Sequence, residues 1–176
     1  MRDYSQNPGK SLMDRWALVA GSGARRTRFG EIPKYVEGLY DLNNQLYAWM
    51  VPNGSWGESN AGLIIGGSDA LLVDTLWDKK YTRAMLDAMG PLTDAAPVKY
   101  VVNTHADGDH WWGNQLIPQA EIITSKACYD ELLYIQPKSM LLLGRLGKLL
   151  STVGLFGAKK IGHCFQGMVA PYDFQE

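Results

Sequence analysis

The sequence predicts an α/β fold in which helices pack on the face of a sheet. Two observations carry this prediction. Short apolar segments bounded by Gly, Asn or Pro alternate with a segment of helical periodicity between residues 61 and 124. With 46% apolar residues, a chain of 176 residues can bury one hydrophobic core but is short for two ordinary domains. We therefore expect an N-terminal extension over residues 1–33 and a single domain over residues 34–176.

The N-terminal segment, residues 1–33, is polar and shows no sustained helical or strand period. It contains a small basic cluster of Arg25, Arg26 and Arg28. The formal net charge of the whole chain is −1, and no extended basic stripe accompanies the cluster. A solvated arm is therefore favoured over a nucleic-acid site, and we expect a small-molecule partner with neither nucleic acid nor a membrane.

Two strand pairs are predicted next. The aromatic and aliphatic residues of segment 36–50 favour a hairpin, with Asn43-Asn44 as its turn. The apolar segments Ala61–Ile65 and Ala70–Asp74 form a second pair that turns at Gly66-Gly67-Ser68. Both strands of the second pair are apolar enough to be buried.

A helix and a strand follow. Asp78 is a plausible N-cap for a helix over Lys79–Met89, and Gly90-Pro91 is expected to end that helix. The segment Val98–Asn103 is a short, strongly apolar strand. This alternation of strand, helix and strand predicts an α/β layer with helices on the sheet face.

The C-terminal part predicts one more strand and two helices. Glu121–Thr124 is the strand, and Ser125 caps a helix to about Ile135, before Pro137. The second helix is expected over Lys138–Val153 and is apolar around much of its circumference. It either packs on the core and covers the site, or it serves as a membrane-surface or dimerisation helix.

The chemistry of the chain is concentrated in the motif loop, residues 103–114, which follows the strand over residues 98–103. Its potential metal ligands are His105, Asp107, Asp109 and His110. Loops at the carboxyl ends of strands are where α/β sheets place ligand sites, and alternate residues of an extended loop point the same way. We therefore expect the first three ligands to converge, while Gly108 permits a tight turn that adds the fourth.

Carboxylates this close in sequence repel one another unless a cation or an arginine neutralises them. A bound divalent cation is the simpler explanation, and imidazole with carboxylate donors suits zinc, iron or manganese. The alternative is a solvated acidic turn in which the histidines cap a following helix.

The run from His105 to His110 reads HxDxDH and resembles the HxHxDH signature of the metallo-β-lactamase superfamily. The Asn-Thr before it and the Gly-Asn after it are similar to that family as well. Asn60 and the strand end Leu71–Thr75 lie upstream in the same order, so the resemblance covers roughly residues 35–125. It implies a metallo-β-lactamase-like αβ/βα sandwich, of which this chain carries the N-terminal αβ half.

The resemblance also implies roles for individual residues. His105 and Asp107 would bind a first metal ion. Asp109 and His110 would bind a second, and Asp109 would also orient the attacking water and act as the catalytic base. Asp74 would brace the metal-binding loop by hydrogen bonding, although on its sequence context alone it is a turn or cap residue. One or two divalent ions, zinc with iron or manganese as alternatives, are therefore expected.

The chain departs from the family pattern at two places. Asp107 replaces the second histidine of the signature with a harder, anionic donor, which leaves the metal's identity open. The family completes its site with a histidine, a bridging aspartate and a final histidine further downstream. The remaining histidine here, His163, does not match that context. The chain thus resembles a C-terminally truncated member. The exposed face of the half-sandwich would then be covered by a second copy, by another partner or by a rearrangement, and a homodimer is our hypothesis.

The expected function is that of a metal-dependent hydrolase that attacks an ester, lactone, amide or related bond. The motif does not encode the substrate. Two alternatives stay open: a catalytically inactive fragment or interaction domain with an incomplete metal site, and an iron-dependent redox protein of the same fold, which Asp107 favours slightly.

Three further observations concern environment and packing. Cys128 and Cys164 lie far apart without a CxxC spacing, which argues against a disulfide framework or a thiolate zinc site. The sequence shows neither a secretory h-region nor a transmembrane span, so a cytoplasmic setting is expected. Trp111 and Trp112 either line a substrate pocket or pack beneath the motif loop.

Overall fold

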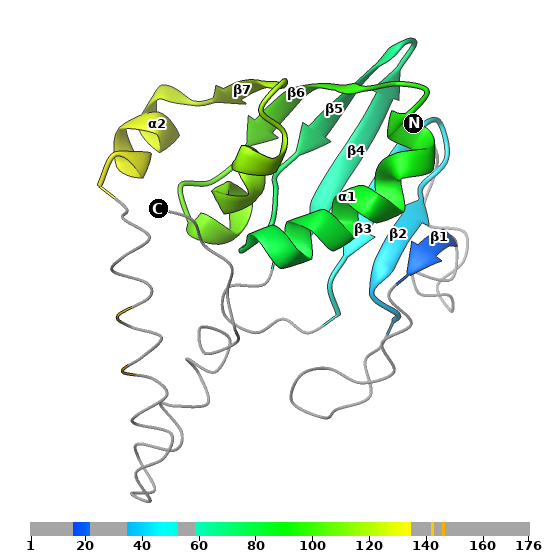
Figure 1. The fold of residues 1–176 in the computed structure, drawn as a ribbon, viewed down its shortest axis with the longest axis horizontal. Coiled ribbons are helices and arrows are strands. Elements are labelled where there is room, and N and C mark those ends of the chain that lie inside the picture. The colour runs from blue at the N-terminus through cyan, green and yellow to red at the C-terminus, as the bar shows by residue number, and fades with distance from the viewer. Residues whose placement is uncertain (1–15, 22–34, 53–58, 135–141, 143–145, 147–176) are drawn as a thin grey trace, which may run out of the picture.

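The computed structural model describes residues 16–21, 35–52, 59–134, Leu142 and Leu146. These residues form a seven-stranded sheet whose spatial order follows the chain from β1 to β7, with helix α1 lying across one face (Figure 1). The strands are β1 (Ala17–Gly21), β2 (Gly38–Asp41), β3 (Leu46–Met50), β4 (Ala61–Gly66), β5 (Asp69–Val73), β6 (Val98–Asn103) and β7 (Glu121–Thr124). The helices are α1 (Lys79–Thr93) and α2 (Lys126–Leu132), with short 3-10 turns η3 (Gly108–His110) and η4 (Trp112–Leu116).

Strand β1 was not predicted from the sequence. It lies within the segment interpreted as an arm and pairs antiparallel with β2, at the edge of the sheet. Its Leu18 and Val19 side chains are exposed, so the strand lacks the alternation of burial by which sequence patterns are recognised. Backbone pairing with β2 selects the extended conformation here, and the prediction of an arm is therefore wrong for residues 17–21.

The two predicted antiparallel pairs, β2 with β3 and β4 with β5, are confirmed. Asn43 and Asn44 in the first turn have φ angles of 71° and 56°, and Gly67 in the second turn has a φ of 70°. Asn and Gly tolerate this left-handed region better than other residues, so they place both turns where the sequence indicated.

Helix α1 begins where the sequence predicted. The Asp78 side chain accepts a hydrogen bond from the Tyr81 N–H at 2.7 Å, which satisfies one of the free donors of the first turn. The helix does not end at Gly90-Pro91 but runs to Thr93. Pro91 removes one donor only, and the Asp94 N–H restores the pattern by donating to the Gly90 carbonyl.

The C-terminal elements agree with the sequence in part. Strand β7 and the Ser125 cap of α2 are confirmed, with the Ser125 hydroxyl accepting from the Cys128 N–H at 3.1 Å. Helix α2 ends at Leu132, earlier than predicted. The second predicted helix, 138–153, lies outside the described residues apart from two positions. Among the described helices, none is long and apolar enough to cross a membrane.

The core lies between the sheet and α1. Leu63, Leu72 and Val101 from the sheet and Met85 and Met89 from the helix are fully buried there. Along the strands, core-facing side chains alternate with side chains of the opposite sheet face. Exposed apolar residues on that opposite face include Leu18, Leu46, Ile64 and Ile123, which are 46%, 39%, 41% and 41% exposed. The expected homodimer across this face stays a prediction.

We expect Leu63→Ala to lower the free energy of unfolding by about 2–5 kcal/mol, because truncation leaves a cavity in a fully buried position. Leu133→Ala is the matched control, since Leu133 is 65% exposed and its truncation should change stability by less than about 0.5 kcal/mol. Denaturant unfolding measures both. Equal effects of the two substitutions would contradict the described core.

Candidate metal centre

The candidate site lies where two neighbouring parallel strands end. Val73 of β5 pairs with Val102 of β6, so the residues that follow them leave the sheet at one edge. The Asp74 N–H still donates to the Val102 carbonyl at 2.8 Å, although Asp74 has a φ of 60°. A left-handed backbone is uncommon for a residue other than Gly and needs support from its surroundings. This turn directs Asp74 toward the start of the motif loop.

The Asp74 carboxylate accepts three hydrogen bonds from that loop. Its Oδ1 accepts from the Thr104 N–H at 2.7 Å, and its Oδ2 accepts from the Thr104 hydroxyl at 2.6 Å. The Oδ2 atom also lies 2.8 Å from Nδ1 of His110. Only 7% of the Asp74 side chain is exposed. These contacts are the ones that a bracing residue requires, and they supply the support for the unusual backbone.

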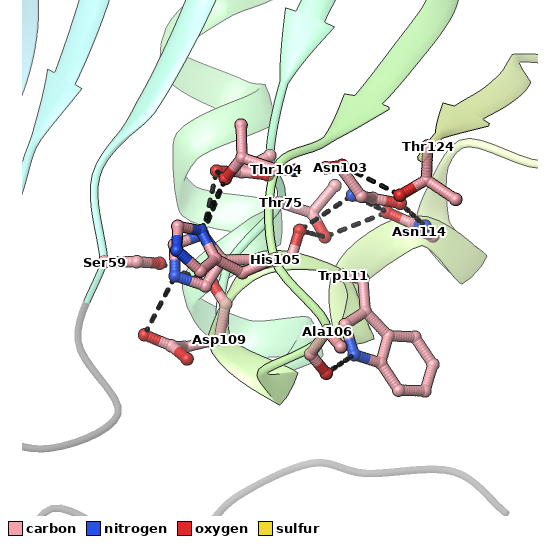
Figure 2. A network of polar contacts seen from close by, with 12 residues as sticks. Ser59, Thr75, Asn103, Thr104, His105, Ala106, Asp109, Trp111, Asn114 and Thr124 are labelled. Atoms are coloured by element: carbon pink, nitrogen blue, oxygen red, sulfur yellow. Dashed lines mark hydrogen bonds and ion pairs between the residues drawn. The ribbon is translucent and has the colours of Figure 1, made fainter. Parts of the chain in front are cut away.

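Two asparagines and a threonine hold the far side of the motif loop (Figure 2). The Asn114 side chain donates to Oδ1 of Asn103 at 2.7 Å, and the Asn103 side chain donates to the His110 carbonyl at 2.8 Å. The Thr75 hydroxyl donates to Oδ1 of Asn114 at 3.1 Å. Sequence reasoning assigned none of these three a role. The signals in the sequence were the Asn before and the Asn after the ligand run and the strand end Leu71–Thr75, which were part of the family resemblance.

Gly108 is required because a larger side chain would collide with its neighbours, and not because its backbone adopts a conformation that only glycine tolerates. A Cβ atom added at Gly108 would lie 2.5 Å from the Trp112 ring, far inside van der Waals contact. Trp112 is 5% exposed and packs against Trp77 with 4.8 Å between ring centroids. The packing interpretation is therefore confirmed for Trp112. Trp111 donates its indole N–H to the Ala106 carbonyl at 2.8 Å (Figure 2).

Two of the predicted ligands face each other. Nε2 of His110 lies 3.7 Å from Oδ2 of Asp109, and the side chains are 19% and 16% exposed. Two donors bound to one zinc ion at roughly 2.0–2.2 Å each are at most about 4.4 Å apart. The observed separation therefore fits a shared cation. The ring of His105 lies next to that of His110, with 4.6 Å between centroids.

The predicted convergence of the full ligand run is not seen. No group of three or more His, Cys, Asp or Glu side chains in the described part of the chain is close enough to hold a metal ion. Asp107 is exposed, and it is the residue before η3. The extended backbone changes there into a 3-10 turn, so the alternation that would align His105, Asp107 and Asp109 ends. His163 lies outside the described residues.

Negative charge is concentrated at the candidate site. Burial raises the pKa of the Asp109 carboxyl group. The charge of His110 opposes this shift in part, and the negative charges of Asp107 and Asp74 add to it. The hydrogen bond that His110 donates to Asp74 raises the pKa of His110 above 6.5. Burial opposes this shift in part, and the charges of Asp109, Asp74 and Asp107 add to it. A concentration of negative charge around a partly buried imidazole is an environment that favours a bound cation.

Comparison with known proteins supports one family. A sequence model described as the metallo-beta-lactamase superfamily matches residues 54–162, which is more than half of the chain. The chain belongs to the metallo-β-lactamase superfamily. Among curated proteins, no match was found.

Solved structures agree on the fold. A double mutant of a sec-alkyl sulfatase is 16% identical, with a TM-score of 0.59 over 83% of this chain and 28% of its own. A stereoselective inverting sec-alkylsulfatase from Pseudomonas sp. is 19% identical, with a TM-score of 0.48 over 66% of this chain and 24% of its own. A metallo-β-lactamase from Hirschia baltica is 21% identical, with a TM-score of 0.43 over 52% and 44%. The chain spans less than half of the length of each of these proteins.

In metal-free protein, we expect Asp74→Asn to lower the pKa of His110, because the substitution removes the carboxylate that chiefly raises it. The raised pKa means that the folded chain binds this proton more tightly than the unfolded chain. The resulting stabilisation is complete below about pH 6.5 and is lost as the pH rises through the raised pKa.

An NMR titration of the His110 ring measures this pKa, and unfolding at several pH values measures the stability. Asp69→Asn is the control, since Asp69 lies at the opposite end of β5 and contacts Lys99. The same His110 pKa in Asp74→Asn and in the parent chain would refute the hydrogen bond.

Proposed function

We propose that this chain carries part of the active site of a metal-dependent hydrolase. The observation that carries the proposal is the placement of His110 by Asp74, which leaves Nε2 facing the Asp109 carboxylate at 3.7 Å. Membership in the metallo-β-lactamase superfamily supports it, because that superfamily includes metal-dependent hydrolases.

The residues that would hold the cation are Asp109 and His110, with His105 beside them. Imidazole nitrogens with a carboxylate oxygen suit zinc, and iron and manganese are the alternatives. Asp107 is exposed at the rim of the site, where its charge reaches both Asp109 and His110. A second ion held by His105 and Asp107 belongs to the same proposal. The remaining ligands would come from outside the described residues or from water.

When bound, a divalent cation supplies Lewis-acid activation of water and stabilises the negative charge that develops on the substrate. The protein's own residues do the rest. Asp109 is a partly buried carboxylate whose free oxygen can accept a hydrogen bond from water and hold its proton. Asp74 keeps the proton of His110 on Nδ1 and prevents the ring from turning.

The substrate belongs to one of the classes with an electrophilic carbonyl, sulfuryl or phosphoryl centre. Esters, lactones and amides are the first group to test. Sulfate esters join them because a sec-alkyl sulfatase shares the fold over most of this chain, although that likeness concerns the fold alone. The fold itself does not choose among these substrates.

A second candidate is an inactive domain with an incomplete metal site. It is favoured by the observation that no three potential ligands come together within the described ranges. An iron-dependent redox protein is a third candidate, and it is supported only by the anionic Asp107 in the ligand run. Metal identity and amount separate all three.

The test is the metal content per chain, measured by mass spectrometry on protein purified without chelators. We expect at least one equivalent of zinc in the parent chain, and its loss in the double substitution Asp109→Ala with His110→Ala. Asp130→Ala is the matched control, because Asp130 is an exposed carboxylate that pairs with Lys126 on α2 and should leave the metal in place.

Other metal contents favour the alternative functions. Iron in place of zinc, with visible absorbance, would favour the redox protein. A metal-free parent chain would favour the inactive domain. If zinc is present, hydrolysis of an ester, a lactone, an amide and a sulfate ester should be assayed in the parent and the double variant, and activity on any of them should disappear with the metal.

A further inference from the structure

We propose that Thr104 is a positioning residue that fixes the ring proton of His105 on Nδ1, so that Nε2 of His105 is left as a donor for a cation. The inference rests on the proposed metal-dependent function and adds a residue to it. Thr104 lies at the carboxyl end of β6, directly before His105, and its side chain contacts both Asp74 and the His105 ring (Figure 2).

The Thr104 hydroxyl contacts more than one polar group but can donate its proton to only one of them. A threonine hydroxyl has one proton to donate, and an ionised carboxylate can only accept. The Thr104 hydroxyl lies 2.6 Å from Oδ2 of Asp74, so its proton is committed to that oxygen. The hydroxyl oxygen keeps lone pairs that can accept a hydrogen bond from a different direction.

The second step concerns His105. Its Nδ1 lies 3.0 Å from the Thr104 oxygen. If Nδ1 carries the ring proton, this contact is a hydrogen bond. If Nε2 carries it, two lone pairs face each other at 3.0 Å with no proton between them, because the hydroxyl proton points to Asp74. The geometry therefore selects the Nδ1–H form of a neutral His105 ring.

The third step compares the two histidines. Nδ1 of His110 donates to the same Oδ2 atom of Asp74, at 2.8 Å. Asp74 thus acts on His110 directly and on His105 through Thr104. Both rings then carry their proton on Nδ1, and the Nε2 atom of each ring keeps an electron pair with which it can bind a cation. The rings lie side by side, with 4.6 Å between centroids and 35° between planes.

The position of Thr104 is itself fixed. Its backbone N–H donates to Oδ1 of Asp74 at 2.7 Å, so the residue is tied to one carboxylate by both backbone and side chain. Loss of the hydroxyl alone would leave the backbone bond in place. Neutral histidine binds metals through the nitrogen that lacks a proton, and the hydrogen bond at the other nitrogen decides which one that is.

The experiment compares Thr104→Val, which removes the hydroxyl at nearly constant shape, with Thr104→Ser, which keeps it. The first readout is the tautomer of His105 in metal-free protein, from long-range proton–nitrogen NMR at a pH where the ring is neutral. We expect the Nδ1–H form in the parent and in Thr104→Ser, and the Nε2–H form or a mixture in Thr104→Val. His110 should keep its Nδ1–H form throughout, which verifies the fold.

The second readout is the affinity for zinc, measured by competition with a chromophoric chelator. Thr104→Val should weaken binding on the order of 10–100-fold, the range typical of residues that orient a metal ligand. Thr104→Ser should restore it to within about threefold. Unchanged zinc affinity in Thr104→Val would overturn the proposal, as would an unchanged His105 tautomer.

Failure of this proposal and failure of the hydrolase proposal give different results. The tautomer is read without metal, so a parent chain that binds no zinc refutes the metal-dependent function and leaves the Thr104 assignment to the NMR result. A parent chain that binds zinc, with the same His105 tautomer in Thr104→Val, refutes the role of Thr104 alone.

Discussion

The candidate site depends on the carboxylate of Asp74. This one side chain holds the backbone of Thr104, the hydroxyl of Thr104 and the ring of His110. The Asp74 carboxylate is nearly buried, and a buried carboxylate requires hydrogen bonds from its neighbours. The need to satisfy Asp74 therefore fixes how the motif loop leaves the sheet.

The parallel pairing of β5 and β6 makes this arrangement possible. Because both strands run in the same direction, Asp74 and Thr104 leave the sheet at the same edge. The left-handed backbone of Asp74 has an energetic cost, typically about 1–3 kcal/mol for such residues. Its three hydrogen bonds to the loop offset that cost. The unusual backbone of Asp74 thus places its carboxylate where it can hold both Thr104 and His110.

Local features of the sequence predicted much of the fold. Asn43-Asn44 and Gly67 placed the turns, and Asp78 placed the start of α1, because the preferences of these residues act within a few positions of the chain. The end of α1 was misplaced, because Pro91 removes only one helical donor and Leu92, which follows it, still packs against the core. Strand β1 was missed for a similar reason: its pairing partner, β2, defines it.

The sequence indicated which residues belong to the candidate site but not how they are arranged in space. The HxDxDH run marked the candidate ligands, and the resemblance to the metallo-β-lactamase superfamily implied a bracing role for Asp74. The resemblance included Thr104 but gave it no role, because its link to Asp74 joins residues that are 30 positions apart. It also expected Asp107 to align with Asp109. The 3-10 turn that begins after Asp107 prevents that alignment.

The most direct test of the account is a crystal structure of the zinc-soaked chain, with anomalous scattering recorded at the zinc edge. We expect a zinc peak roughly 2.0–2.2 Å from both Nε2 of His110 and the Asp109 carboxylate, with Nδ1 of His110 still bound to Asp74. A peak elsewhere, or coordination through Nδ1 of His110 with the Asp74 contact broken, would contradict it.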